Sequence, residues 1–275
     1  MVKRPLYVLT LLSLFFSIFL YIRFNTAEVK APSDYPVHNL DTGLNYTTIQ
    51  TGIDAPETLT GHTIFVEKGT YYENVVVNKA LWLIGENNST TIIDGKGIDN
   101  VLTITADNVN ITGFSIQNSN YVGVDLSSRR HCTIENCVIK NHGWSVYLAY
   151  AHSNTVRNNI ITNSSSYSVF INIGNNNIVI GNNITNNEST GVQIEQGSEG
   201  NIIADNNISS NRYEGIYVLH SDLNLIINNL LSFNGHGNPP LIYPGIKLMY
   251  SSNNTLARNI ILNNSGGIVV YFDWC

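Results

Sequence analysis

Hydrophobic side chains recur at a long, regular interval over the second half of the chain. Within each interval two aliphatic residues lie two positions apart, which is the spacing of one face of a β-strand and not of a helix. The first residues of these pairs form the column Val124, Val146, Val169, Val192, Ile216, Ile246 and Ile268. The second residues form the column Leu126, Leu148, Ile171, Ile194, Val218, Leu248 and Val270. The pattern predicts short strands that return in the same order once per interval.

The interval is 22 to 24 residues, apart from one step of 30. That long step indicates an insertion of about seven residues between Phe233 and Gly245. An asparagine column follows the same period: Asn118, Asn141, Asn163, Asn187, Asn211, Asn234 and Asn264. Asparagine tolerates the left-handed backbone of tight turns, and its amide can bond to an identical residue above and below it. We therefore expect these residues to form turns and to have a structural role.

Such a period fits an all-β fold, a single right-handed parallel β-helix in which each repeat is one coil of about three short strands. Less regular strand-like runs precede the repeats, at Thr63–Val66, Asn74–Val77, Leu81–Ile84, Thr91–Ile93, Val101–Ile104 and Ile111–Ile116. They extend the solenoid to about nine coils over residues 63–275. Residues 27–62 are expected to be a linker and a cap, in which Ile49 and Ile53 would cover the open edge of the first coil.

Five phrases stand in a fixed order near the start of this region: Tyr46-Thr-Thr-Ile-Gln50, Ile64-Phe-Val-Glu-Lys-Gly-Thr-Tyr-Tyr-Glu-Asn-Val75, Leu81-Trp-Leu-Ile-Gly85, Thr91-Ile-Ile-Asp-Gly95 and Asn110-Ile-Thr-Gly-Phe114. They resemble the opening of NosD-type right-handed β-helix proteins, and the resemblance covers residues 40 to 275. These proteins belong to the pectate-lyase-like superfamily, also described as a carbohydrate-binding and sugar-hydrolysis domain. The resemblance implies an exported β-helix. It leaves the substrate open, because the superfamily includes lyases, hydrolases, epimerases, adhesins and proteins assigned to copper-enzyme maturation. Calcium as a cofactor rests on this resemblance alone.

The composition agrees with such a fold and argues against nucleic acid as a partner. Only 12% of the residues are charged, and 40 of the 275 are asparagine. A coiled coil needs many charged helix formers, whereas a nucleic-acid-binding protein is expected to be basic. This chain has a formal net charge of -6.

The N-terminal segment predicts export. Residues Leu6 to Ile22 carry no charge and are expected to form a hydrophobic helix, whereas Lys3, Arg4 and Arg23 flank them. Residues 1–26 are therefore either a signal peptide or an uncleaved membrane anchor with its positive end in the cytoplasm. A poor cleavage motif before Ala27 favours the anchor, and either alternative places the rest of the chain outside the cytoplasm. At the other end the chain stops on a strand, with Trp274 beyond it, so we expect a missing segment or a partner to cover the last coil.

Strand alternation predicts an aromatic surface on one face of the solenoid. The residues expected to point outward there include Trp144, Tyr147, Tyr167, Phe170, Tyr217 and Tyr271. Aromatic rings with polar neighbours can stack against sugar rings, although cross-strand aromatic pairs also stabilise sheets without any ligand. This face is the candidate polysaccharide-binding surface.

The sequence shows no obvious catalytic set. Glu195 and Glu214 are expected on neighbouring coils, but five positions apart along the strand direction, which is roughly 16 Å. His236 and Lys247 lie in or beside the insertion, where functional residues tend to concentrate. His236, Lys247 and Glu195 are therefore the first choices if the protein is an enzyme, and no metal ligands are assigned.

Three hypotheses follow from these observations. The leading one is an exported β-helix, tethered to the membrane or secreted, that binds polysaccharide along its aromatic face. The alternatives are a polysaccharide lyase or glycoside hydrolase, and a surface scaffold or adhesin without catalytic activity.

Overall fold

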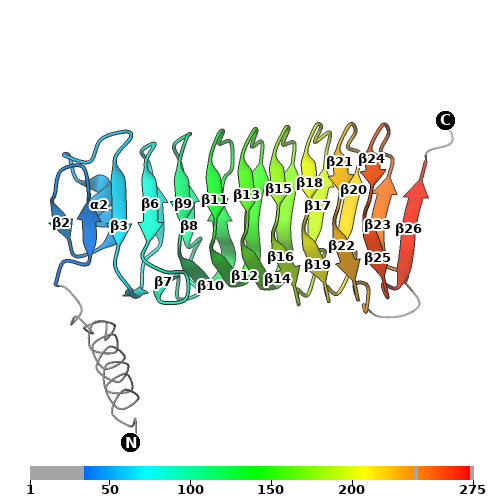
Figure 1. Cartoon of the computed structure of the whole chain (residues 1–275), viewed down its shortest axis with the longest axis horizontal. Helices are drawn as coiled ribbons and strands as arrows, with labels where there is room; N and C mark the ends of the chain where they lie inside the picture. The colour runs from blue at the N-terminus through cyan, green and yellow to red at the C-terminus, as the bar shows by residue number, and fades with distance from the viewer. Residues whose placement is uncertain (1–33, 238–240, 273–275) are drawn as a thin grey trace, which may run out of the picture. The chain divides into compact units, whose positions relative to one another are not determined.

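The computed structural model describes residues 34–237 and 241–272 of the chain. The hydrophobic helix predicted within residues 1–26 lies outside these ranges, as do Trp274 and Cys275. Residues 63–272 form a right-handed parallel β-solenoid of nine coils, which stack side by side in Figure 1. Each coil contributes one strand to each of three faces, so the predicted fold class is confirmed for the described residues.

The first face consists of nine parallel strands in sequence order. They are β3 (Thr63–Val66), β6 (Trp82–Gly85), β9 (Asn110–Thr112), β11 (Thr133–Glu135), β13 (Thr155–Arg157), β15 (Ile178–Ile180), β18 (Ile202–Ala204), β21 (Leu225–Ile227) and β24 (Thr255–Ala257). The middle residue of most of these strands points inward and is fully buried, as in Val156 and Val179. Three residues are enough for a strand here, because the coils above and below supply its hydrogen-bond partners.

The second face begins after a sharp corner. Its strands are β4 (Gly69–Tyr71), β7 (Thr91–Asp94), the first halves of β10 (Ser115–Asp125), β12 (Val138–Ala149) and β14 (Ile160–Asn172), then β16 (Asn183–Thr185), β19 (Asn207–Ser209), β22 (Leu230–Ser232) and β25 (Ile260–Leu262). The run predicted as one strand from Ile111 to Ile116 is in fact β9 and the start of β10. Gly113 separates them in the left-handed conformation, with φ +82, where a turn needs glycine.

The third face completes each coil. Its strands are β5 (Val75–Val77), β8 (Leu102–Ile104), the second halves of β10, β12 and β14, then β17 (Val192–Glu195), β20 (Ile216–Leu219), β23 (Pro244–Met249) and β26 (Gly266–Tyr271). Both aliphatic columns predicted from the sequence lie here in consecutive register, and all their members except the last are buried in the core. In the last coil Ile268 and Val270 are 50% and 40% exposed. Tyr217 pairs with Lys247 across the insertion, so the step of 30 residues is one enlarged coil.

Buried asparagines form a ladder at each of the three corners. At the corner between the first and second faces the ladder runs through Asn159, Asn182, Asn206, Asn229 and Asn259. Each Oδ1 accepts bonds from the main-chain N–H and the Nδ2 of the preceding ladder residue, and each Nδ2 also donates to a main-chain carbonyl. The side chains thereby satisfy main-chain groups at corners that no strand pairing reaches.

The predicted asparagine column needs one correction. Asn118, Asn141 and Asn163 have positive φ and bond to each other near the surface. The buried ladder of the same corner instead contains Ser164, Asn187, Asn211, Asn234 and Asn264. Asn163 therefore lies level with Asn186 and not with Asn187, a shift of one residue.

A short capping region precedes the first coil. Strand β1 (Val37–Asn39) pairs antiparallel with β3 and with β2 (Asn45–Tyr46). Helix α2 (Ile49–Asp54) is capped at its N-terminus by Thr48, whose side chain forms a capping box with Thr51. Ile49 and Ile53 are fully buried in the core of the solenoid.

Candidate functional site

The outward columns of the third face have the register expected from the sequence. The central one runs Asp125, Tyr147, Phe170, Gln193, Tyr217, Lys247 and Val269 from coil to coil. Trp144 and Tyr167 are neighbours in the column beside it. Strand pairing therefore brings most of the predicted aromatic residues onto adjacent strands.

Four of these rings form one cluster on β12 and β14. Trp144 lies 4.6 Å from Tyr147 and 5.6 Å from Tyr167 between ring centroids, and Tyr167 stacks on Phe170 at 4.6 Å. Phe170 is only 5% exposed and so supports the other rings without offering a free face. Trp144, Tyr147 and Tyr167 are partly exposed and remain open to a ligand.

Tyr217 and Tyr271 lie apart from this cluster. Gln193, which is 6% exposed, separates Tyr217 from Phe170 in the central column. Tyr271 lies in β26, two coils beyond Tyr217, and is 51% exposed. The predicted surface is thus a compact group of rings with two outlying tyrosines.

A groove of about 640 Å³ opens beside the cluster, where the second and third faces meet. We call it the aromatic groove, because four tyrosines line it together with polar residues: Tyr167, Tyr213, Tyr217 and Tyr243. The long strands β12 and β14 turn this corner as continuous strands. After β16 and β19, by contrast, the segments Glu188-Ser189-Thr190 and Arg212-Tyr213-Glu214 run between strands and line the groove.

The insertion contributes directly to this groove. Tyr243, near its end, packs against Tyr213 with ring centroids 4.7 Å apart. These two rings line the groove together with Tyr217 and with Tyr167, which lies two coils before Tyr217. A contact between the insertion and the preceding coil therefore helps to shape the hollow.

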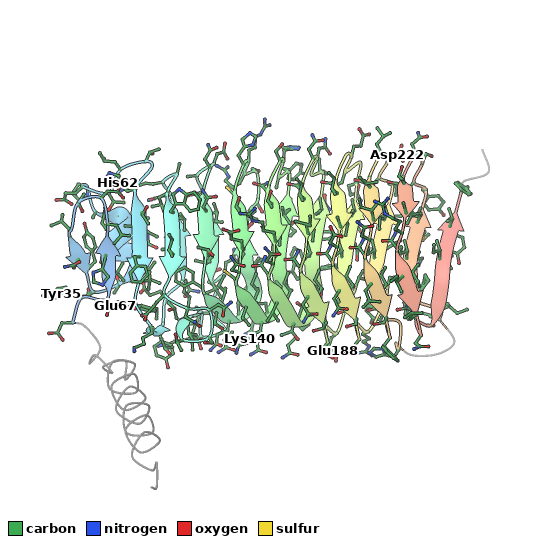
Figure 2. All side chains as sticks on the ribbon, in the orientation of Figure 1. Tyr35, His62, Glu67, Lys140, Glu188 and Asp222 are labelled. Carbon is green, nitrogen blue, oxygen red and sulfur yellow. The ribbon has the colours of Figure 1, made fainter. Side chains whose placement is uncertain are left out.

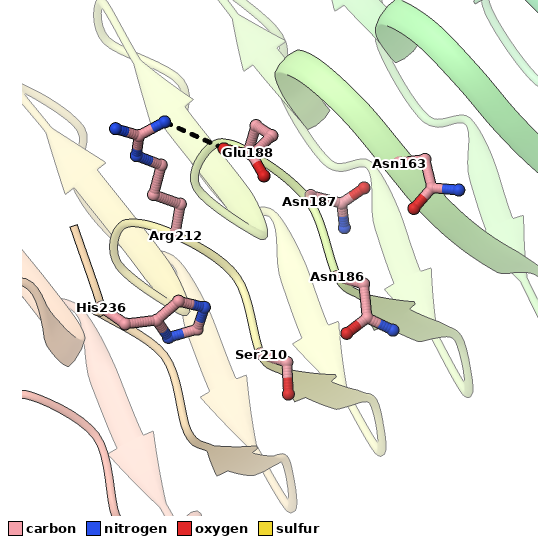
Figure 3. Close-up of a pocket in the computed structure, with 7 residues that line it drawn as sticks. All are labelled: Asn163, Asn186, Asn187, Glu188, Ser210, Arg212 and His236. Atoms are coloured by element: carbon pink, nitrogen blue, oxygen red, sulfur yellow. Dashed lines mark hydrogen bonds and ion pairs between the residues drawn. The ribbon is translucent and has the colours of Figure 1, made fainter.

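A second hollow of about 470 Å³ adjoins the first and is almost entirely polar (Figure 3). Asn163, Asn186 and Ser210 line it, with His236 at one end. Glu188 and Arg212 line both hollows, and their side chains form an ion pair of 2.9 Å between them. Glu188 is well exposed and points outward from the ribbon in Figure 2.

Buried charge lies beneath the aromatic groove. Glu214 is 4% exposed and accepts a bond from Lys247 Nζ at 3.1 Å and one from the Thr190 hydroxyl at 3.3 Å. The Lys247 ammonium also lies 4.9 Å from the centroid of the Tyr217 ring. Burial, and then the nearby carboxylates of Glu214 and Glu195, raise the pKa of Tyr217 to about 12. Tyr217 is therefore a neutral phenol at physiological pH and Lys247 is already paired.

The predicted catalytic residues do not lie around one point. His236 lines the polar hollow, whereas Lys247 is bound to Glu214 on the third face. Glu195 lies at the far end of β17, where its carboxylate accepts a hydrogen bond from Gln193. Arg212, Tyr213 and Tyr243 also line the groove but were not predicted from the sequence, because they lie at corners outside the strand columns. The sequence does show a break in strand alternation after Asn211, which marks the corner that contains Arg212 and Tyr213.

The described residues do not provide a site suited to copper. No group of three or more His, Cys, Asp or Glu side chains that could hold a metal ion occurs in them. Cys137 is buried with its thiol bonded to the Glu135 carbonyl, and burial raises its pKa to about 12. Cys132 is buried as well, and burial raises the pKa of its thiol.

Among residues 34–237 and 241–272 no helix has the length and apolarity needed to span a membrane.

Comparisons with known proteins agree with this fold. The segment 56–240 matches the family model described as periplasmic copper-binding protein (NosD). A cell surface glycoprotein of Methanothermus fervidus is 39% identical over 115 residues, a match that spans 40% of this chain and 19% of that protein. The solved alginate lyase from Paenibacillus sp. str. FPU-7 superposes with a TM-score of 0.59 at 13% identity, covering 82% of this chain and 95% of the lyase.

A second solved structure, the A-module of the mannuronan C-5 epimerase AlgE4 from Azotobacter vinelandii, has a TM-score of 0.56 at 15% identity. The alignment covers 77% of this chain and 71% of the module. At such low identities these structures show a shared fold alone. The family match covers most of the solenoid and confirms the resemblance read from the opening phrases, so this chain belongs to the NosD family.

Proposed function

We propose that this protein is an exported β-helix that binds polysaccharide in the aromatic groove and along the adjoining rings of the third face. The observation that carries the proposal is the groove itself, where four tyrosines surround polar side chains in about 640 Å³. Sugar rings have apolar faces that stack on aromatic rings and hydroxyl rims that need hydrogen-bond partners. The groove offers both kinds of group within reach of one ligand.

The arrangement along the solenoid supports a polymeric ligand. Trp144, Tyr147 and Tyr167 continue the aromatic surface from the groove onto β12 and β14. These strands are ~4.8 Å apart from coil to coil, so rings on neighbouring coils can contact successive parts of one extended chain. A polysaccharide lying along the axis would meet several rings at once.

The state of the ionisable groups favours binding over catalysis. Lys247 donates a hydrogen bond to Glu214, and Tyr217, with a pKa of about 12, is protonated. Lys247 is thus held by a buried carboxylate and Tyr217 is not a free base. His236, Lys247 and Glu195 remain predictions for an enzymatic function, which the release of reducing ends or unsaturated uronides would reveal.

The location outside the cytoplasm belongs to the same proposal. The family description names a periplasmic protein, and the Methanothermus fervidus relative is a cell surface glycoprotein. The uncharged segment from Leu6 to Ile22 gives a route of export, either as a signal peptide or as a membrane anchor. A polysaccharide at the cell surface would then be accessible to the groove.

A glycan array tests the proposal. The full chain is compared with a Tyr167→Ala/Tyr217→Ala variant and with Tyr72→Ala, which removes an exposed tyrosine outside the groove lining. We expect binding by the wild type and by Tyr72→Ala, and a loss of binding in the double variant. Equal binding by all three proteins would place the ligand elsewhere, and no binding by any of them would refute the proposal.

A further inference from the structure

The charges around the aromatic groove are arranged in compensated pairs. Two cations lie there, and each is bonded to a carboxylate: Arg212 to Glu188 at 2.9 Å and Lys247 to Glu214 at 3.1 Å. A third carboxylate, Glu195, lies on the same face and bonds to the neutral amide of Gln193. These two cations and three carboxylates have a combined formal charge of -1.

Among the described residues at the groove, a polymer of uronic acids would find the two cations, Arg212 and Lys247, already paired. Its carboxylates would need charge-assisted bonds from Arg212 or Lys247, and each of these side chains already bonds a glutamate. Glu214 is 4% exposed, so the loss of its lysine would leave a buried carboxylate unpaired. The unpaired partner and the excess negative charge both oppose an anionic ligand.

Neutral sugars can be bound without disturbing either pair. A sugar hydroxyl can donate to the free lone pairs of a carboxylate and accept from a guanidinium in the same pose. The well-exposed Glu188 and the half-buried Arg212, whose ion pair is drawn in Figure 3, present these groups to both hollows. The hydroxyl groups of Ser165, Ser166 and Ser189 add neutral partners along the groove.

We propose that the aromatic groove selects neutral polysaccharides and rejects polyuronates, because internal ion pairs already occupy its cations. This inference rests on the proposed function. It further assigns Glu188 as a specificity-determining residue, since its carboxylate is what keeps Arg212 from an anionic ligand.

Affinity electrophoresis of the full chain tests the inference. Native gels contain a neutral polymer (a glucan or a galactomannan) or a polyuronate (alginate or polygalacturonate). Three proteins are compared: wild type, Glu188→Gln, and Glu199→Gln as a matched control. Glu199 is an exposed glutamate outside the groove lining, so its substitution changes the net charge equally. The Glu188 side chain is 67% exposed, so its replacement is expected to leave the fold intact.

We expect a neutral polymer to retard the wild type and the polyuronates to leave it unretarded. Glu188→Gln should bind polyuronates about tenfold more tightly, because it frees Arg212 for one charge-assisted hydrogen bond to a uronate carboxylate. Glu199→Gln should not change this affinity. Tighter binding of polyuronates by the wild type would overturn the inference while leaving the proposed function standing. Equal behaviour of the two variants would remove the role of Glu188, and the absence of retardation by every polymer would refute the proposed function as well.

Discussion

Replacement of one ladder asparagine should cost far more stability than replacement of its neighbour. The Asn206 side chain is 1% exposed and takes part in four hydrogen bonds. Its Oδ1 accepts from the main-chain N–H of Asn182 at 2.9 Å and from Asn182 Nδ2 at 3.0 Å. Its Nδ2 donates to the Val179 carbonyl at 2.9 Å and to Asn229 Oδ1 at 3.0 Å. Asn207, the next residue, is exposed, and its side chain bonds only Asn183 at 2.8 Å among the described residues.

The magnitude follows from these bonds. At about 1 kcal/mol per hydrogen bond, the loss of four lowers the free energy of unfolding by roughly 4 kcal/mol in Asn206→Ala. Partners left unsatisfied in the corner would increase this cost, because buried polar groups without a bond are destabilising. Asn207→Ala removes one exposed bond and should lower the free energy of unfolding by about 1 kcal/mol or less.

Urea unfolding followed by circular dichroism at the strand band measures both effects. The two variants remove the same chemical group from adjacent positions, so differences in composition and in the unfolded chain largely cancel. We expect the midpoint of Asn206→Ala to fall well below that of the wild type and that of Asn207→Ala to lie near it. Similar midpoints for the two variants would refute the claim that the ladders hold the corners together.

Three further predictions concern buried groups. Burial lowers the pKa of His142 from 6.5 to about 4, so on acidification the unfolded chain binds a proton before the folded chain does. The free energy of unfolding should therefore fall by about 3 kcal/mol from pH 6.5 to pH 4, and the same pH dependence in His142→Gln would contradict this. Gly113→Ala should prevent folding or lower the thermal midpoint strongly, because its Cβ would lie 2.3 Å from the Gly85 carbonyl oxygen at positive φ; a midpoint like that of the wild type would contradict the packing. The Cys137 thiol, buried and with its pKa raised to about 12, should resist iodoacetamide at pH 8 in the native protein and react once it is unfolded in urea, whereas rapid native labelling would contradict its burial.

The strand columns could be predicted from the sequence because the backbone of a β-strand points alternate side chains to opposite faces. Val146, Val169 and Val192 lie two residues before Leu148, Ile171 and Ile194, and strand alternation leaves one arrangement in which all six are buried. The predicted asparagine column is wrong by one residue between Asn163 and Asn187, because it joins outer turn residues to the buried ladder. Asn163 precedes Ser164, which occupies the ladder position in that coil, and spacing alone does not distinguish an outer turn residue from an inner one.

The groove could not be predicted in the same way, because it depends on contacts that the period does not determine. Tyr243 belongs to the insertion and meets Tyr213 from the preceding coil. Arg212 forms an ion pair with Glu188 of the preceding coil, and both residues lie at corners between strands. Phe170 was expected to face a ligand because it points outward, but the neighbouring rings cover it.

The position of a bound sugar would show most directly whether the aromatic groove is the polysaccharide-binding site. A crystal structure of the full chain with a neutral oligosaccharide, chosen as the tightest ligand in the glycan array, would locate it. We expect a sugar in the aromatic groove, stacked on Tyr167 or Tyr243 and hydrogen-bonded to Glu188 or Arg212 with their ion pair intact. A sugar bound elsewhere on the solenoid, with the groove empty, would contradict polysaccharide binding in the aromatic groove.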